Sequence, residues 1–191
     1  MTKKPEEPPQ YKRCIAIAGF KNVKIKDIKD VLERVRGEPP EVCVQFFDAR
    51  TIAGKEHLYF SALNALKAFE HKKNISSTLA IETLLYASAQ RQIRKAVEML
   101  GIKKDSSQIV VLIIAESKHE TNSSLKVISR LVPCERDDSV FYLTDEKIGN
   151  IKKLFGISDL EIGAKLRRGG LEKEALADLV IEHGALLATQ S

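Results

Sequence analysis

The sequence predicts an α/β protein: a small mixed sheet of about four strands packed with helices, followed by C-terminal helices. Three observations predict this class. Short apolar, β-branched runs alternate with longer segments whose apolar residues recur every three to four positions. The run 108–115 (QIVVLIIA) is the most apolar in the chain, which indicates a central strand buried on both faces. After Thr144 the pattern is helical, which indicates a C-terminal helical segment.

Each expected element depends on its own run of residues. Residues 1–11 are rich in Pro and Glu, which is typical of a disordered tail, and residues 12–191 predict a single α/β domain. Pro133 suits an edge strand, because it lacks the N–H that a central strand needs. Strands are expected at 12–20, 41–48, 108–115 and, as an edge, 132–136. Helices are expected at 26–36, 55–70, 76–102, 120–131, 144–155, 158–166 and 171–188.

The helix expected at 76–102 organises the chain, because its apolar positions form one stripe at helical spacing. Ser76 or Ser77 is placed to cap its first turn, and Gly101 is placed to end it. Glu82 projects into the apolar stripe, and two interpretations of it stay open. It is either a partly buried carboxylate held by a hydrogen bond or an Arg, or a general base.

Composition and motifs limit the classes of function. The 191 residues are 43% apolar, and no apolar run approaches the roughly 20 residues that span a bilayer. Cys14, Cys43 and Cys134 lie far apart without a CxxC pair, which argues against a disulfide framework and a zinc site. The motifs GxxxxGK[ST], GxGxxG and GxSxG are absent from the sequence. We therefore expect a cytoplasmic protein without a metal, a cofactor or a catalytic motif.

The positive charge is concentrated in one segment. Residues 67–104 hold eight Lys or Arg against three Glu, which accounts for the whole net charge of +5. Such a patch is the footprint of a phosphate-rich partner, although an ordinary solvated helix face has the same composition. The lysines at 72 and 73 also suit the negative end of the preceding helix. The candidate RNA-binding residues are Lys72, Lys73, Asn74, Arg91, Gln92, Arg94 and Lys95.

The last expected helix is apolar nearly all round. Opposite its broad leucine-rich arc lies a second stripe, at i, i+4, i+7 and i+11. We expect this stripe to bind a partner protein, and the alternative is that it packs under the helix at 144–155. The four candidate interface residues are Ala177, Ile181, Gly184 and Ala188.

Several runs together resemble a known family. The run 81–102 (IETLLYASAQRQIRKAVEMLGI) has an acidic residue, bulky apolar residues, an aromatic, a small polar residue, an Arg-Gln-Ile triplet and a Gly-Ile pair before the buried strand. The run 52–58 (IAGKEHL) adds a Gly-to-His helix entry upstream, and the runs 151–157 (IKKLFGI) and 179–187 (LVIEHGALL) add two closing segments downstream. Together these runs resemble the small kinase-binding subunit family of the KEOPS/EKC tRNA-modification complex, and in particular its archaeal members. This is the family of the PRPK-binding protein TPRKB. Thr83, where a branched apolar residue is usual, and the charged tail depart from it.

The resemblance implies a non-enzymatic accessory subunit. The family binds the atypical kinase/ATPase subunit of a complex that makes the N6-threonylcarbamoyl group on an adenosine next to the tRNA anticodon. Archaeal members are similar in binding the single-stranded 3′ CCA end of tRNA. On this interpretation the lysines and arginines hold phosphates, Asn74 and Gln92 contact base edges, and the last helix anchors the kinase subunit.

Two rival interpretations remain. A small-molecule-binding or catalytic α/β domain would use Glu82 and His57 in a cleft, and would lose activity in Glu82→Gln without losing stability. A plain adaptor without RNA affinity would tolerate charge reversal anywhere on the basic patch.

Overall fold

The computed structural model describes residues 11–24, 42–132, 134–166 and 171–189. The helix expected at 26–36, most of the tail and Pro133 lie outside the described residues. The chain divides into two compact units: a sheet unit (residues 1–49 and 101–140) and a helical unit (50–100 and 141–191). The single domain expected at 12–191 stays a prediction.

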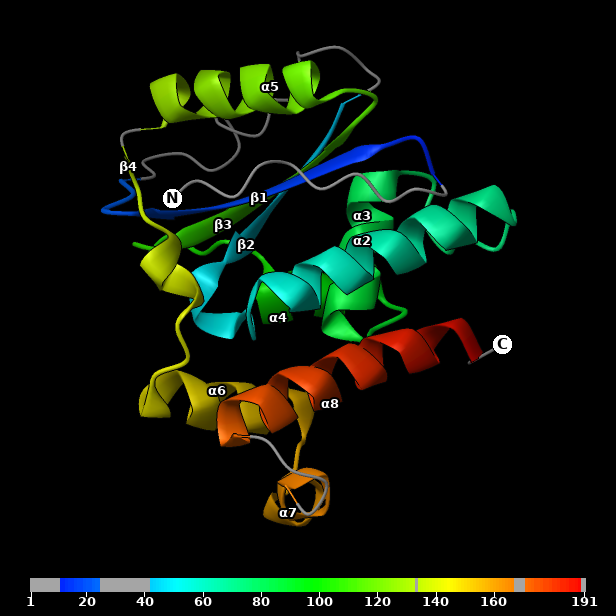
Figure 1. The fold of residues 1–191 in the computed structure, drawn as a ribbon, viewed down its shortest axis with the longest axis vertical. Coiled ribbons are helices and arrows are strands. Elements are labelled where there is room, and N and C mark those ends of the chain that lie inside the picture. The colour runs from blue at the N-terminus through cyan, green and yellow to red at the C-terminus, as the bar shows by residue number, and fades with distance from the viewer. Residues whose placement is uncertain (1–10, 25–41, 133, 167–170, 190–191) are drawn as a thin grey trace. The chain divides into compact units, whose positions relative to one another are not determined.

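The sheet unit is built on four strands in the order β2-β3-β1-β4 (Figure 1). They are β1 (Cys14–Lys21), β2 (Cys43–Asp48), β3 (Ile109–Ala115) and the two-residue β4 (Glu135–Arg136). All three strand pairs are antiparallel. Every residue of β3 is buried, and β3 has a hydrogen-bonded strand on each side.

Helix α5 (Lys118–Leu131) covers one face of this sheet (Figure 1). A capping box starts it: Ser117 accepts the Glu120 N–H, and the Glu120 carboxylate accepts the Ser117 N–H at 2.9 Å. Leu125 and Ile128 then pack on alternate residues of β1 and β3. This cluster fixes which side of α5 faces outward.

The helical unit holds the remaining α-helices of the described residues. Helix α8 packs against α2, α3, α6 and α7. The unit's apolar core includes Ile148 and Ile151 of α6 and Leu176 and Val180 of α8. No helix in the described part of the chain is both long and apolar enough to cross a membrane. The bounds are α2 (Lys55–Glu70), α3 (Leu79–Ser88), α4 (Ile93–Leu100), α6 (Asp145–Phe155), α7 (Asp159–Leu166) and α8 (Glu172–Leu186), with short 3-10 turns at 49–51, 138–141 and 187–189.

Most of the expected elements are confirmed. The α/β class, the four strands, the buried central strand, the helix at 55–70 and the helix that follows Thr144 all occur. The pairing differs from a mixed sheet, since every pair of neighbouring strands in the described sheet is antiparallel. Strand direction depends on tertiary connections that apolar spacing does not encode. The cap of the 76–102 region is Thr78, not Ser76 or Ser77.

The single helix expected at 76–102 is wrong, because the chain forms α3 and α4 with a break between them. Ala89 adopts a left-handed backbone, with φ 52° and ψ 34°. The Gln90 N–H then donates to the Leu85 carbonyl at 3.1 Å, which closes the end of α3. Glycine normally supplies such an end, and the sequence here has none.

Candidate nucleic-acid interface

The helical unit contains a basic groove with a volume of about 550 Å³. Three cationic side chains line it, and none of its lining residues is acidic. The lining combines α2, the connection between α2 and α3, the end of α3 and the end of the chain's last helix. We call this site the basic groove; its lining residues are Asn64, Lys67, Ala68, His71, Lys73, Ile75, Tyr86, Arg91, Ala185, Leu187, Ala188 and Thr189.

One face of α2 forms a wall of the groove. Asn64, Lys67 and His71 follow helical spacing and therefore lie on the same side of α2. At the end of α2 the Lys73 N–H donates to the Ala68 carbonyl at 2.8 Å, across a left-handed Lys72 (φ 55°). This turn brings Lys73 back beside the carbonyl end of α2, where a cation complements the helix dipole.

Glu82 holds the connection that follows. Its carboxylate is fully buried and accepts the Ser76 N–H at 2.7 Å and the Ile75 N–H at 3.0 and 3.1 Å. A buried carboxylate with such donors is a structural anchor, which confirms the hydrogen-bonded interpretation of Glu82. Because Ile75 lines the groove, Glu82 sets the position of that wall from behind.

Tyr86 and Arg91 close the groove on the α3 side. Tyr86 lines the groove but is 4% exposed, so it is almost completely buried. Burial is the main cause that raises the pKa of the Tyr86 hydroxyl. The negative charge of Glu82 raises this pKa further, and the positive charge of Arg91 lowers it. Tyr86 is therefore a neutral hydrogen-bonding phenol beside a guanidinium at neutral pH.

The groove unites only part of the predicted RNA-binding set. Lys73 and Arg91 line it, whereas the other five predicted residues are exposed outside it. Arg94 pairs instead with Glu98 at 3.0 Å, one turn along α4. Those five residues are Lys72, Asn74, Gln92, Arg94 and Lys95. Sequence reasoning missed Asn64, Lys67 and His71, although their helical spacing, with Ala68, was a usable signal.

The predicted partner stripe does not form one exposed face. Gly184 is buried, and a Cβ there would lie 2.6 Å from the backbone oxygen of Tyr86. Ala177 and Ile181 are half-buried, and Ala188 is exposed but lines the basic groove. The close approach of α8 to the end of α3 explains the small residue at 184.

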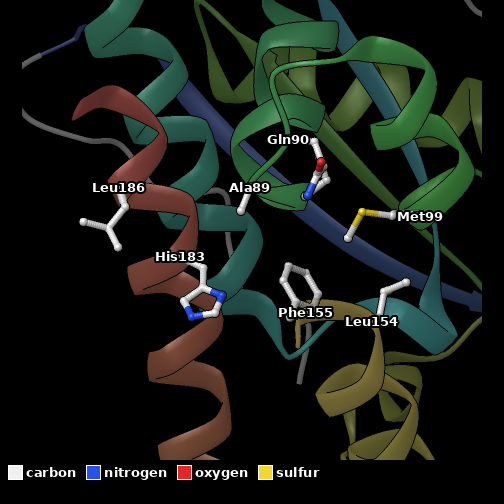
Figure 2. Close-up of a pocket in the computed structure, with 8 residues that line it drawn as sticks. Ala89, Gln90, Met99, Leu154, Phe155, His183 and Leu186 are labelled. Atoms are coloured by element: carbon white, nitrogen blue, oxygen red, sulfur yellow. The ribbon is translucent and has the colours of Figure 1, made fainter. Parts of the chain in front are cut away.

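A second hollow, of about 290 Å³, lies on the other side of the end of α8 and is called here the α8 hollow. Figure 2 shows His183 and Leu186 coming from α8, opposite Gln90 and Met99, with Phe155 between. Leu186 is 54% exposed, so this rim presents an apolar side chain to solvent. The full lining is Ser88, Ala89, Gln90, Met99, Leu154, Phe155, His183 and Leu186.

His57, the other residue of the catalytic interpretation, is buried and fully bonded. Its Nδ1 accepts the Ala53 N–H at 3.2 Å, and its Nε2 lies 2.8 Å from the Ala87 carbonyl, which sets the Nε2–H tautomer. Burial is the main cause that lowers the pKa of His57 to about 4. Neither His57 nor Glu82 lines the groove or the α8 hollow. Within the described ranges, no three His, Cys, Asp or Glu residues are grouped to hold a metal ion.

The fold and the groove together define a class: an α/β protein whose helical unit carries a basic groove. Comparison with known proteins gives the family. The family model described as "Kinase binding protein CGI-121" matches residues 20–187, so the chain belongs to the CGI-121 family of kinase-binding proteins.

Two curated relatives agree with this family. The chain is 32% identical to "Regulatory protein Cgi121" of Methanocaldococcus jannaschii over 135 residues, which is 71% of this chain and 83% of the relative. It is 30% identical to "EKC/KEOPS complex subunit CGI121" of Candida glabrata over 106 residues, which is 56% of this chain and 57% of the relative. The resemblance found in the sequence is thereby confirmed.

Proposed function

We propose that the protein is a non-catalytic, cytoplasmic accessory subunit of the KEOPS/EKC complex. In this role it binds the kinase/ATPase subunit and the single-stranded 3′ CCA end of tRNA, and so supports N6-threonylcarbamoyladenosine formation. The family membership supports the kinase partner, and the yeast relative carries the name of the complex.

The basic groove is the observation that carries the RNA half of the proposal. Lys67, Lys73 and Arg91 supply positive charge around a concavity that has no acidic lining residue. Proteins recognise RNA chiefly at single-stranded ends and loops, whose bases can enter a pocket and meet an aromatic ring or a guanidinium plane. Tyr86 and Arg91 provide both groups at one side of the groove. A volume of about 550 Å³ lies within the usual range for a bound nucleoside-sized group.

The end of α8 is the surface we assign to the kinase subunit. Ile181 is half-buried, and Leu186 projects at the rim of the α8 hollow. An exposed aliphatic side chain beside a hollow can serve as an anchor for a partner protein. Gly184 serves packing within the unit, so the interface uses the neighbouring positions of the same helix.

A tRNA titration tests the groove. Lys73→Gln with Arg91→Gln should weaken binding of intact tRNA, and should flatten the slope of log K against log salt by about 1.4, since each phosphate contact on a single strand contributes about 0.7. The matched control is Arg94→Gln with Lys95→Gln, which removes two charges outside the groove and should change neither quantity. Equal affinity for intact tRNA and tRNA without its CCA end would refute the assignment.

A binding assay with the purified kinase subunit tests the α8 surface. Leu186→Glu should weaken the complex at least tenfold, because it places a charge at an apolar anchor. Leu171→Glu, at the exposed start of the same helix, is the matched control and should leave binding unchanged. If Leu186→Glu binds the kinase subunit like the wild type, the surface is wrongly placed.

A further inference from the structure

The sheet unit contains a second cationic cleft, with a volume of about 480 Å³, formed by the outer side of α5 and by β4. We call it the α5 cleft. Three of its six lining residues are cations, and two others carry an amide or a hydroxyl. The lining residues are Asn122, Leu125, Lys126, Ser129, Arg130 and Arg136.

The core of the sheet unit fixes this arrangement. Leu125 and Ile128 hold α5 on the sheet, so Lys126 and Arg130 point outward, one helical turn apart. Side chains at that spacing have Cβ atoms about 5–6 Å apart. Arg136 joins them from another part of the chain, because β4 pairs with β1 through the partners Phe20 and Arg136. Three cations from two elements therefore converge on one cleft.

Nearby acidic side chains are engaged elsewhere. Glu135 and Asp137 both pair with Lys21, at 3.3 and 2.8 Å. The hydrogen bond from Lys21 to Asp137 is the main cause that lowers the pKa of Asp137 to about 2. Glu120 is used in the capping box of α5. Within residues 11–24, 42–132 and 134–140, no salt bridge is found between an acidic group and the three cleft cations. Among the described residues, the three cleft cations therefore form no ion pair with those neighbours.

We propose that the α5 cleft binds the phosphodiester backbone of RNA, as a second contact separate from the basic groove; this inference rests on the proposed function of tRNA binding. Arg and Lys side chains, with amides and hydroxyls, are the groups that contact nucleic-acid phosphates. The cleft has no aromatic lining residue, in contrast to the basic groove with Tyr86. The contact is therefore to phosphates and not to bases, and it does not depend on the CCA end.

The test compares full-length variants by titration with intact tRNA and with tRNA lacking its CCA end, across a range of salt concentrations. Lys126→Gln with Arg130→Gln should weaken binding of both RNAs by the same factor, about tenfold at low salt, and flatten the salt slope by roughly 1.4 to 1.8. Lys103→Gln with Lys104→Gln removes two exposed cations of the same unit outside the cleft, and should leave both affinities unchanged. Both substituted positions in the cleft are exposed, so thermal unfolding should match the wild type.

The outcomes separate this inference from the proposed function. If the cleft variant weakens both RNAs while Lys73→Gln with Arg91→Gln has no effect, the α5 cleft stands and the groove assignment fails. If only the groove variant weakens binding, the α5 cleft is refuted and the groove stands. The inference is also refuted if Lys126→Gln with Arg130→Gln loses binding to inorganic phosphate or polyglutamate but keeps its tRNA affinity. The cleft would then bind a small anion or an acidic peptide. If Lys103→Gln with Lys104→Gln weakens tRNA binding as much as the cleft variant does, the inference is refuted, because the effect then comes from general charge attraction.

Discussion

Glu82→Gln tests whether the buried carboxylate is a structural anchor or a catalytic base. In the folded protein its two oxygens accept the backbone N–H groups of Ile75 and Ser76. Glutamine keeps one oxygen but turns an NH₂ group toward an N–H donor. Hydrogen bonds to a charged group contribute about 1.5–3 kcal/mol, and a buried donor left unpaired costs about 1–3 kcal/mol. We therefore expect the free energy of unfolding to fall by about 2–4 kcal/mol.

The assay is urea unfolding at pH 7, followed by circular dichroism. Glu98→Gln is the matched control, since that carboxylate is exposed in a pair with Arg94 and should contribute less than about 1 kcal/mol. The Glu82 variant should also bind tRNA more weakly with an unchanged salt slope, because the Ile75 wall loosens while no cation is removed. Unchanged stability together with a lost activity or a lost bound metabolite would refute the anchor and support the catalytic rival.

Four further substitutions test helix packing, the protonation of His57 and the backbone at Ala89. Gly184→Ala should destabilise the protein by about 1–3 kcal/mol, since its Cβ would meet the Tyr86 carbonyl at 2.6 Å, whereas Gly149→Ala, with open space around it, should be neutral or stabilising in the same unfolding assay. The pKa of His57 is about 4, below the value near 6.5 in the unfolded chain, so its contribution to stability should be complete above about pH 6.5. That contribution, up to about 3 kcal/mol, should be lost as the pH falls toward 4, and the corresponding slope in unfolding experiments should disappear in His57→Asn. Ala89→Gly should raise the unfolding free energy by up to about 1 kcal/mol if Ala89 is left-handed, whereas in a continuous helix it would lower it by about the same amount.

The strands and most helices could be predicted from the sequence because local patterns determine them. All seven residues of β3 are apolar and five of them are β-branched, so no surface position suits them. Thr144 caps α6 through a bond from the Lys147 N–H, which is a contact between near neighbours. The antiparallel register, by contrast, depends on partners about 100 residues apart, such as Cys14 and Ala115. No periodicity in the sequence carries that information.

The candidate site was only partly predictable for the same reason. Charge counting pointed to residues 67–104, and Lys73 and Arg91 of the predicted set line the groove. The groove's other side, however, comes from the end of the last helix, where the sequence favoured a partner interface. The small residue at 184 was noticed but explained wrongly, since it permits contact with α3 inside the unit. Small residues on a helix indicate that another segment packs closely against it. They do not indicate whether that segment belongs to the same chain or to a partner protein.

The break at Ala89 has a functional consequence. In one continuous helix Arg91, Arg94 and Lys95 would share a face, and the three charges would form a single patch. The left-handed residue ends α3, so Arg91 falls in the connection and lines the groove, while Arg94 on α4 pairs with Glu98. A left-handed alanine costs roughly 1–2 kcal/mol, which the closing hydrogen bonds and the packing of the unit must offset. We therefore regard the break as the feature that separates Arg91 from Arg94 and Lys95, and Ala89→Gly is the substitution that measures its cost.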